Sequence, residues 1–171
     1  MTIARPRIYF SASISGGRED APGYAALVGA LARRGIVLTE HIGRPDLSDV
    51  GESGPDDAEI YARDISWLRE ADVVIAEVTT PSLGVGYEVA RAAGMGKRIV
   101  CLFRPETGRR LSAMIRGNPA VRVLEYGSGE HPDDVARRAM AAATADRPQR
   151  VSRTEPDTDS SDSLEETARE S

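Results

Sequence analysis

Residues 73–78 (VVIAEV) constrain the fold more than any other segment, because five of these six side chains are apolar. A strand that is apolar on both sides must be covered on both faces, which is typical of the centre of a parallel sheet. Parallel strands are joined by right-handed crossovers, usually through helices. We therefore expect an α/β fold in which helices cover both faces of a sheet.

The rest of the body alternates between strand-like and helix-like segments in the same way. From apolar spacing and from the Gly and Pro residues between segments, we predict further strands at 7–13, 36–38, 98–103 and 121–125, and helices at 24–34, 58–71, 85–95 and 133–143. Residues 42–57 have no periodicity and are predicted to form a mobile loop. The pattern predicts a flavodoxin-like or Rossmann-like three-layer sandwich with a five-stranded parallel sheet.

The chain divides into one domain and an acidic tail. Residues 1–144 are enough to bury a self-sufficient core. Residues 145–171 are rich in Ser, Thr, Pro, Asp and Glu, so we expect them to be disordered and outside the active unit. Residues 146–171 carry −4 of the net charge of −5. The body is therefore near neutral and has no case for binding polymeric nucleic acid, which requires a clustered basic face.

The sequence gives no sign of export or of membrane insertion. The first residues have no apolar signal core, and no stretch approaches the length of a membrane span. The one cysteine, Cys101, lies in an apolar run and is predicted to be a buried, inert thiol. We expect a cytoplasmic protein that makes no membrane contact.

In doubly wound sheets the ligand lies beyond the carboxyl ends of the strands, so the segments that follow the strands are the places to search. Residues 13–18 (SISGGR) follow the first strand. Paired glycines allow close approach of the backbone to a ligand, and Ser and Arg side chains suit phosphate oxygens. The segment lacks the spacing of an NTP-binding loop and a full dinucleotide fingerprint. An ordinary Gly-Gly turn explains it equally well.

Other candidate residues are ambiguous when each is taken alone. Glu88 is predicted in the first turn of a helix, where an acid also serves simply to complement the helix dipole. Ser82 fits an ordinary turn or N-cap, and Asp64 fits a solvated residue or the partner of a nearby Arg. Tyr9 fits core packing, and His41 fits the surface. Two carboxylates near one pocket would suggest glycosyl transfer, in which one attacks the anomeric carbon and another group protonates the leaving group.

A set of motifs identifies a family that these residues resemble. In chain order they are IYF (8–10), GGRED (16–20), LTEH (38–41), AEVT (76–79), PSLGVGYE (81–88), CLFRP (101–105) and LSAMIRG (111–117). Together they resemble the 2'-deoxynucleoside 5'-phosphate N-hydrolase family, within the nucleoside 2-deoxyribosyltransferase superfamily, over residues 7–143. The PSLGVGYE and LSAMIRG segments are the most specific of these motifs.

The resemblance implies a flavodoxin-like homodimer that hydrolyses deoxynucleoside 5'-monophosphates to free base and 2-deoxyribose 5-phosphate, without a metal or an organic cofactor. By position, Glu88 would be the nucleophile, Asp64 the acid that assists departure of the base, and Tyr9 the residue that orients nucleophile and sugar. Ser112 would reach the phosphate of the neighbouring subunit, and His41 would lie near the base. The implied substrate-binding set is Ser13, Ile14, Ser15, Gly16, Gly17, Arg18, His41, Ser82, Gly84, Ser112, Ala113 and Met114.

Three positions bear on the substrate. Ala12 stands where relatives often have Gly, and Ser15 where they often have Arg, which affects expected affinity and base preference. In related transferases that act on unphosphorylated nucleosides, an acid stands at the position of Ser82. A carboxylate there would repel a phosphate, so a serine favours a nucleotide.

Three alternatives stay open at this point. A nucleoside 2-deoxyribosyltransferase would pass the sugar to a second base. A ribonucleotide (CMP-type) N-glycosidase would need room beside Tyr9 for a 2'-hydroxyl. A non-catalytic nucleotide-binding module would be expected to lack the carboxylates, yet Glu88 and Asp64 are both present.

Overall fold

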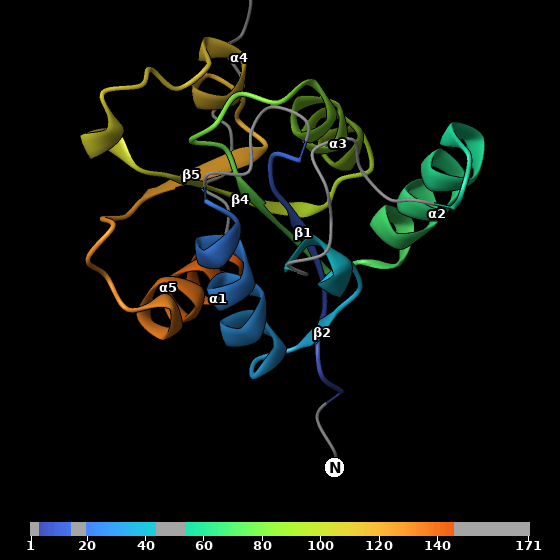
Figure 1. The fold of residues 1–171 in the computed structure, drawn as a ribbon, viewed down its shortest axis with the longest axis horizontal. Helices are drawn as coiled ribbons and strands as arrows, with labels where there is room; N and C mark the ends of the chain where they lie inside the picture. Colours follow the sequence, from blue (N-terminus) through green and yellow to red (C-terminus); the bar gives the residue numbers. More distant parts are fainter. Residues whose placement is uncertain (1–3, 15–19, 44–53, 146–171) are drawn as a thin grey trace, which may run out of the picture.

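The computed structural model describes residues 4–14, 20–43 and 54–145. Its strands form one parallel sheet in the order β2-β1-β3-β4-β5 (Figure 1). The strands are β1 (Arg7–Ser11), β2 (Ile36–Val37), β3 (Val73–Glu77), β4 (Arg98–Phe103) and β5 (Val121–Glu125). This is the flavodoxin-like strand order, so the predicted α/β fold with a five-stranded parallel sheet is confirmed.

Helices cover both faces of the sheet and complete the three layers. Helices α1 and α5 pack side by side on one face, and α2 and α3 lie on the other (Figure 1). The main helices are α1 (Ala21–Ala32), α2 (Asp57–Glu70), α3 (Leu83–Gly94) and α5 (Pro132–Thr144). Three short helical segments are η1 (Glu40–Gly43), η2 (Pro105–Thr107) and α4 (Ala113–Arg116).

Strand β3 lies at the centre of the sheet, as its apolar run predicts. All five of its residues are buried, and it pairs with β1 on one side and β4 on the other. Its side chains alternate between the two layers, with Ile75 in the core under α1 and α5, and Val74 and Ala76 in the core under α2 and α3.

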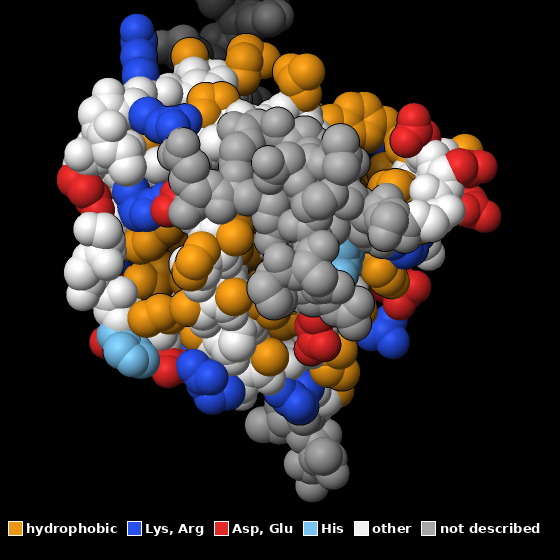
Figure 2. Space-filling view, in the orientation of Figure 1, with side chains coloured by type: hydrophobic (Ala, Val, Ile, Leu, Met, Phe, Trp, Pro, Cys, Tyr) orange, Lys and Arg blue, Asp and Glu red, His pale blue; other side chains and the backbone are white. Residues whose placement is uncertain are grey.

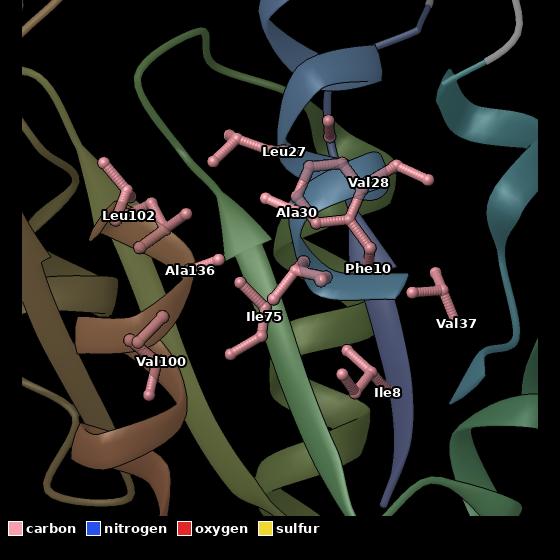
Figure 3. Packing of buried hydrophobic residues seen from close by; sticks show 14 of the residues in the cluster. Ile8, Phe10, Leu27, Val28, Ala30, Val37, Ile75, Val100, Leu102 and Ala136 are labelled. Atoms are coloured by element: carbon pink, nitrogen blue, oxygen red, sulfur yellow. The ribbon is translucent and has the colours of Figure 1, made fainter. Parts of the chain in front are cut away.

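In strand β1 the same alternation places apolar side chains on one face and hydroxyl-bearing side chains on the other. Ile8 and Phe10 point into the core that α1 and α5 cover, where they meet side chains such as Leu27 and Val28 (Figure 3). Tyr9 belongs to the core on the opposite side, and Ser11 shares that face because successive strand residues alternate.

Two helices begin earlier than the apolar pattern predicts. Helix α1 starts at Ala21 instead of Tyr24, since Pro22 is tolerated in a first turn that needs no backbone N–H donor. Helix α3 starts at Leu83 instead of Val85, where the Ser82 side chain caps it by accepting from the backbone N–H of Val85 at 3.4 Å. The prediction that Glu88 lies in the first turn is therefore wrong.

Other boundaries and segments differ by smaller amounts. Strand β1 ends at Ser11 rather than at residue 13. The predicted loop 42–57 lies partly outside the described residues, and its ends belong to η1 and to the start of α2. Asp56 begins α2 with a capping box, in which its side chain accepts from the N–H of Glu59 and the Glu59 side chain accepts from the N–H of Asp56.

Several remaining expectations concern the chain as a whole. Cys101 is fully buried in β4, as predicted, and burial raises the pKa of its thiol to about 12. Among the helices that the structure describes, none is both long and apolar enough to span a membrane. The predicted disordered tail, apart from Ala145, lies outside the described residues.

We expect the substitution Ile75→Ala to lower the free energy of unfolding by about 2–5 kcal/mol, because it leaves a cavity in the fully buried centre of the sheet. Urea denaturation followed by circular dichroism measures the change. Ile36→Ala is the control, since Ile36 lies in β2 with 48% of its surface exposed and should cost much less. Equal losses at both positions would contradict the packing described here.

Candidate active site

A cavity of about 560 Å³ opens at the carboxyl ends of β1 and β3, as expected for a sheet of this order. Its walls come from the end of β1, from η1, from α2 and from the start of α3. The volume lies within the range of small-molecule binding sites. The predicted residues Tyr9, Ile14, His41, Asp64, Ser82, Gly84 and Glu88 all line it, together with Ala12.

Glu88 is held in this cavity by two hydroxyl groups of one strand. The hydroxyl of Tyr9 donates to Oε1 of Glu88 at 2.8 Å, and the hydroxyl of Ser11 donates to Oε2. Residues two apart in a strand face the same side, so β1 presents both donors to α3. The two hydrogen bonds fix the orientation of both carboxylate oxygens.

Opposing effects act on the pKa of Glu88, and their net result is a raised pKa. Burial raises the pKa of Glu88 most, and the negative charge of Asp64 raises it further. The hydrogen bonds from Ser11 and Tyr9 act in the opposite direction, since they stabilise the ionised carboxylate. For Tyr9, burial is the largest effect and the nearby carboxylates add to it, so its pKa is far above the ordinary value and the phenol stays a proton donor.

Asp64 faces the same cavity from α2 and is also part of an ion pair. Nε and Nη2 of Arg63 both lie 3.0 Å from Oδ1 of Asp64. The guanidinium of Arg63 lies 4.6 Å from the ring centroid of Trp67, whose ring is 5.6 Å from that of His41. Asp64 therefore pairs with a nearby Arg, as one interpretation of the sequence predicted, and it also lines the cavity; its role as an acid stays a prediction.

The predicted substrate-binding residues are only partly assembled in the described part of the chain. Ser82, Gly84 and Ile14 line the cavity. Ser13 is buried but does not line it, and its hydroxyl has no hydrogen-bond partner within the described part of the chain. The remaining four predicted residues, Ser15, Gly16, Gly17 and Arg18, lie outside the described residues.

Three predicted residues lie apart from the cavity in the single chain. Ser112 is the N-cap of α4, and Ala113 and Met114 are the first residues of that helix. They do not line the cavity that the described residues form. Met114 is 82% exposed, and Leu83 at the start of α3 is 96% exposed. Figure 2 shows hydrophobic side chains exposed at the top of the molecule, over α3 and α4.

The sequence interpretation missed two residues that shape the site. Ser11 binds the same carboxylate as Tyr9, and its two-residue spacing from Tyr9 in a predicted strand was the signal that could have found it. Thr39 exchanges hydrogen bonds with both backbone groups of Phe10, at 2.9 Å with the N–H and 2.6 Å with the C=O. These bonds hold the start of η1, and with it His41, beside β1.

A second buried acid, Glu77, lies outside the cavity at the end of β3. It is fully buried and accepts hydrogen bonds from the hydroxyls of Thr79 and Tyr126, the latter at 3.2 Å. Arg104 pairs with Asp20 and lies 5.7 Å from the ring centroid of Tyr126. Burial raises the pKa of Glu77, while its hydrogen bonds and the charge of Arg104 oppose that effect. The sequence places this residue in an apolar run and gives no sign of its partners.

Within residues 4–14, 20–43 and 54–145, no group of three or more His, Cys, Asp or Glu side chains is arranged to hold a metal ion.

Two proteins from vertebrates are similar to this chain in sequence. The chain is 52% identical over 130 residues to the 5-hydroxymethyl-dUMP N-hydrolase of Homo sapiens, covering 74% of this chain and 75% of the relative. It is 57% identical over 112 residues to the protein of the same name from Tetraodon nigroviridis, covering 65% of this chain and 79% of the relative.

The structural comparison concerns the fold alone. The solved structure of a CMP N-glycosidase from Clostridium botulinum matches with a TM-score of 0.55 at 17% identity, covering 79% of this chain and 98% of that chain.

Residues 8–147 match the family described as nucleoside 2-deoxyribosyltransferase. This range includes the sheet except for Arg7, all the helices up to and including α5, and both carboxylates of the cavity. The chain therefore belongs to the nucleoside 2-deoxyribosyltransferase family.

Proposed function

We propose that this protein is an N-glycosyl hydrolase that converts 2'-deoxynucleoside 5'-monophosphates into free base and 2-deoxyribose 5-phosphate. The observation that carries the proposal is the geometry of Glu88, a partly buried carboxylate in a cavity of ligand size with both oxygens oriented by hydroxyl groups. The relatives at 52% and 57% identity are named as N-hydrolases of a modified deoxynucleotide, which supports the same reaction class.

The first step forms a covalent ester. A carboxylate oxygen of Glu88 attacks C1' of the deoxyribose, the C1'–N bond breaks, and its electron pair leaves with the base, which takes up a proton from the protonated carboxyl of Asp64. Asp64, on the facing helix, assists the departure of the base. Deoxyribose has no electron-withdrawing 2'-hydroxyl, so positive charge on its ring in the transition state costs less. The Tyr9 and Ser11 hydroxyls hold the attacking group in place.

The second step returns the enzyme to its starting state. Water attacks C1', gives a proton to the Asp64 carboxylate, and displaces the carboxylate of Glu88, which gives 2-deoxyribose 5-phosphate. The two hydroxyl donors stabilise the carboxylate as it leaves, because their hydrogen bonds favour its ionised form. The same contacts therefore serve both steps, and no metal or organic cofactor takes part in either one.

The 5'-phosphate is proposed to lie at the end of the cavity formed by the start of α3. Ser82 caps that helix and lines the cavity, so an anion there meets a hydroxyl and a helix N-terminus rather than a carboxylate. Binding energy at the phosphate positions the distant anomeric carbon for attack. Ser13, Gly16, Gly17 and Arg18 are proposed to complete this end, with His41 near the base.

We also propose a homodimer in which Ser112 of each chain completes the site of the other. The support is that Ser112 lies away from its own cavity, next to a helix whose Met114 is exposed, and that the start of α3 exposes Leu83. Exposed apolar side chains of this kind mark interaction surfaces. In this proposal residues 1–144 form the catalytic unit; the cytoplasmic location stays a prediction.

The proposed activity predicts base release from deoxynucleoside 5'-monophosphates, with 5-hydroxymethyl-dUMP included in the panel, and no release from matched ribonucleotides or nucleosides. Glu88→Ala should lower kcat by at least about 1,000-fold, because the covalent route is lost. Chromatography of the released base measures turnover, and circular dichroism checks that the variant folds.

Other results of these assays would indicate a different function. Turnover of nucleosides only when an acceptor base is added would indicate a transferase, and release from CMP would indicate a ribonucleotide N-glycosidase. Binding of nucleotides without any release would indicate a binding module. Near-normal turnover by Glu88→Ala would refute the nucleophile assignment.

The raised pKa of Glu88 predicts how pH affects stability. A carboxyl whose pKa is raised on folding holds its proton more tightly when folded, so it reduces folding stability as pH rises above its ordinary value of 4.5. Gln does not titrate. Glu88→Gln should therefore gain stability relative to the unchanged protein as pH increases through that region, measured by urea unfolding at a series of pH values.

Glu130 provides a control of opposite sign. Its pKa is lowered, first by the backbone N–H of Gly127 and then by Arg138, so it contributes stability at higher pH that is lost as pH falls. Glu130→Gln should lose stability relative to the unchanged protein as pH rises. The same pH trend in both variants would mean that local burial and partners do not govern these carboxyls.

The shared site predicts that two inactive variants complement each other. When Glu88→Gln and Ser112→Asp chains are mixed and allowed to exchange, each mixed dimer contains one site with both residues intact. Random exchange then restores about a quarter of the original activity. A mixture of Glu88→Gln with Asp64→Asn is the control, because both changes affect residues of the same chain's site. Recovery in the control, or none in the test mixture, would contradict the proposed dimer.

A further inference from the structure

The turn between β3 and α3 (residues 78–82) begins where the sheet stops supplying hydrogen bonds. The backbone N–H of Val78 still donates to the carbonyl of Leu102 in β4, at 2.9 Å. The next N–H, that of Thr79, donates instead to Oε2 of Glu77 at 3.3 Å. Thr79 is buried, and a buried N–H that lacks an acceptor is costly. The carboxylate of Glu77 therefore replaces the sheet as the acceptor at the first residue beyond it.

The neighbours of the Thr79 hydroxyl determine the direction of its hydrogen bonds. The backbone N–H of Arg104 donates to Oγ1 of Thr79 at 3.0 Å, and a backbone N–H can only donate. The proton of the Thr79 hydroxyl is therefore available for Glu77, and it is donated to Oε1. The hydroxyl of Tyr126 donates to the same oxygen at 3.2 Å. An ionised carboxylate only accepts, so it fits these three donors.

The turn leads directly to the cavity. Three residues after Thr79, Ser82 lines the cavity and begins α3. Its side chain accepts from the N–H of Val85 at 3.4 Å, and its carbonyl accepts from the N–H of Gly86 at 3.1 Å. Pro81 also lines the cavity, and its ring restricts the backbone between the two ends of the turn. A displacement of Thr79 is therefore transmitted through a short, restricted segment to the start of α3.

We propose that Glu77 is a positioning residue, which fixes the turn before α3 through Thr79 and so sets where Ser82 and the first N–H groups of α3 face the cavity. Glu77 does not itself line the cavity. The hydrogen bonds that hold the turn are independent of the substrate. Their consequence for phosphate binding rests on the proposed function, in which the start of α3 receives the 5'-phosphate.

The same cluster shows how an acid is tolerated at the buried end of β3. Burying a charge is costly unless polar groups and opposite charges compensate it. Glu77 has three hydrogen-bond donors, and Arg104, whose guanidinium pairs with Asp20 before α1, is close to the cluster through its backbone bond to Thr79. An apolar residue at position 77 would suit the sheet equally well but would remove the acceptor of all three donors. The acid is therefore required by the turn and not by the sheet.

Two substitutions test the proposal, because each removes one hydroxyl that donates to the same atom, Oε1 of Glu77. Thr79→Val changes the turn, whereas Tyr126→Phe acts away from the turn and keeps its ring beside Arg104. Amide hydrogen exchange of the full chain, read by NMR without ligand, reports on Val85 and Gly86. We expect exchange there to become about tenfold faster in Thr79→Val, the effect of one hydrogen bond to a charged group, and to change less than about twofold in Tyr126→Phe. Amides of β1 report overall stability in the same samples.

Two further variants separate the hydrogen bonds from packing. Thr79→Ser keeps the hydroxyl and should keep the exchange rates at Val85 and Gly86 close to those of the unchanged protein. Glu77→Gln keeps the size of the side chain, but its amide turns an N–H donor toward one of the three donors. It should therefore accelerate exchange at the start of α3 as Thr79→Val does.

Two results would overturn the proposal. Equal exchange rates at Val85 and Gly86 in Thr79→Val and Tyr126→Phe would show that the turn has no special dependence on this carboxylate. Unchanged rates in Glu77→Gln would show that the carboxylate does not hold the turn. Because these readings come from the free protein, they stand whether or not the protein releases base from any deoxynucleotide.

A binding measurement then links the inference to the proposed function. The probe is 2-deoxyribose 5-phosphate, titrated into the full chain and followed by calorimetry. Thr79→Val should weaken its binding by about fivefold, because displaced donors lose part of a charge-assisted hydrogen bond, while Thr79→Ser and Tyr126→Phe should bind it as the unchanged protein does. Equal affinity in Thr79→Val and the unchanged protein would contradict the effect on phosphate binding. No binding by the unchanged protein would refute the proposed phosphate site, and hydrogen exchange would still decide the positioning role.

Discussion

The hydrogen bonds from Tyr9 and Ser11 to Glu88 connect the sheet to α3 and fix both oxygens of a carboxylate that faces the cavity. The bonds join residues that are 79 and 77 positions apart in sequence. They can form only if β1 pairs with β3 in the observed register and α3 returns across the sheet. The cavity, the position of Asp64 and the ionisation of Glu88 all follow from that closure.

Glu77 and Glu88 show that burial alone does not define a reactive group. Glu77 and Glu88 both have raised pKa values, and burial is the main cause for both. Glu77 is enclosed by hydroxyls and lies near a cation, and it does not line the cavity. Glu88 has two hydroxyl donors and faces open space of ligand size. The difference lies in access to a ligand rather than in acidity, so a perturbed pKa identifies a functional carboxyl only together with a cavity.

Local patterns predict much of this architecture, and long-range contacts account for what they miss. The apolar run at 73–78 and the alternation of strand-like and helix-like segments were sufficient to predict the five-stranded parallel sheet. The positions of the motifs predicted that Tyr9, Asp64 and Glu88 lie together, and all three line one cavity. The start of α3 was misplaced because a serine cap competes with apolar spacing. Ser11 was missed because strand alternation places it on the same face as Tyr9 but does not reveal that both hydroxyls bind a carboxylate of a distant helix. The contacts of Arg63 with Trp67 depend on rotamers that no spacing encodes.

The alternation along β1 gives this protein an unusual coupling between foldability and chemistry. Even-numbered residues of the strand, Ile8 and Phe10, fill one core, while odd-numbered residues, Tyr9 and Ser11, hold Glu88. Inserting or deleting one residue upstream in this strand would exchange the two sets, since a shift by one residue turns each side chain to the other face. Evolution of the site along β1 is therefore confined to point substitutions at alternate positions, and changes in length must be absorbed by the connecting segments.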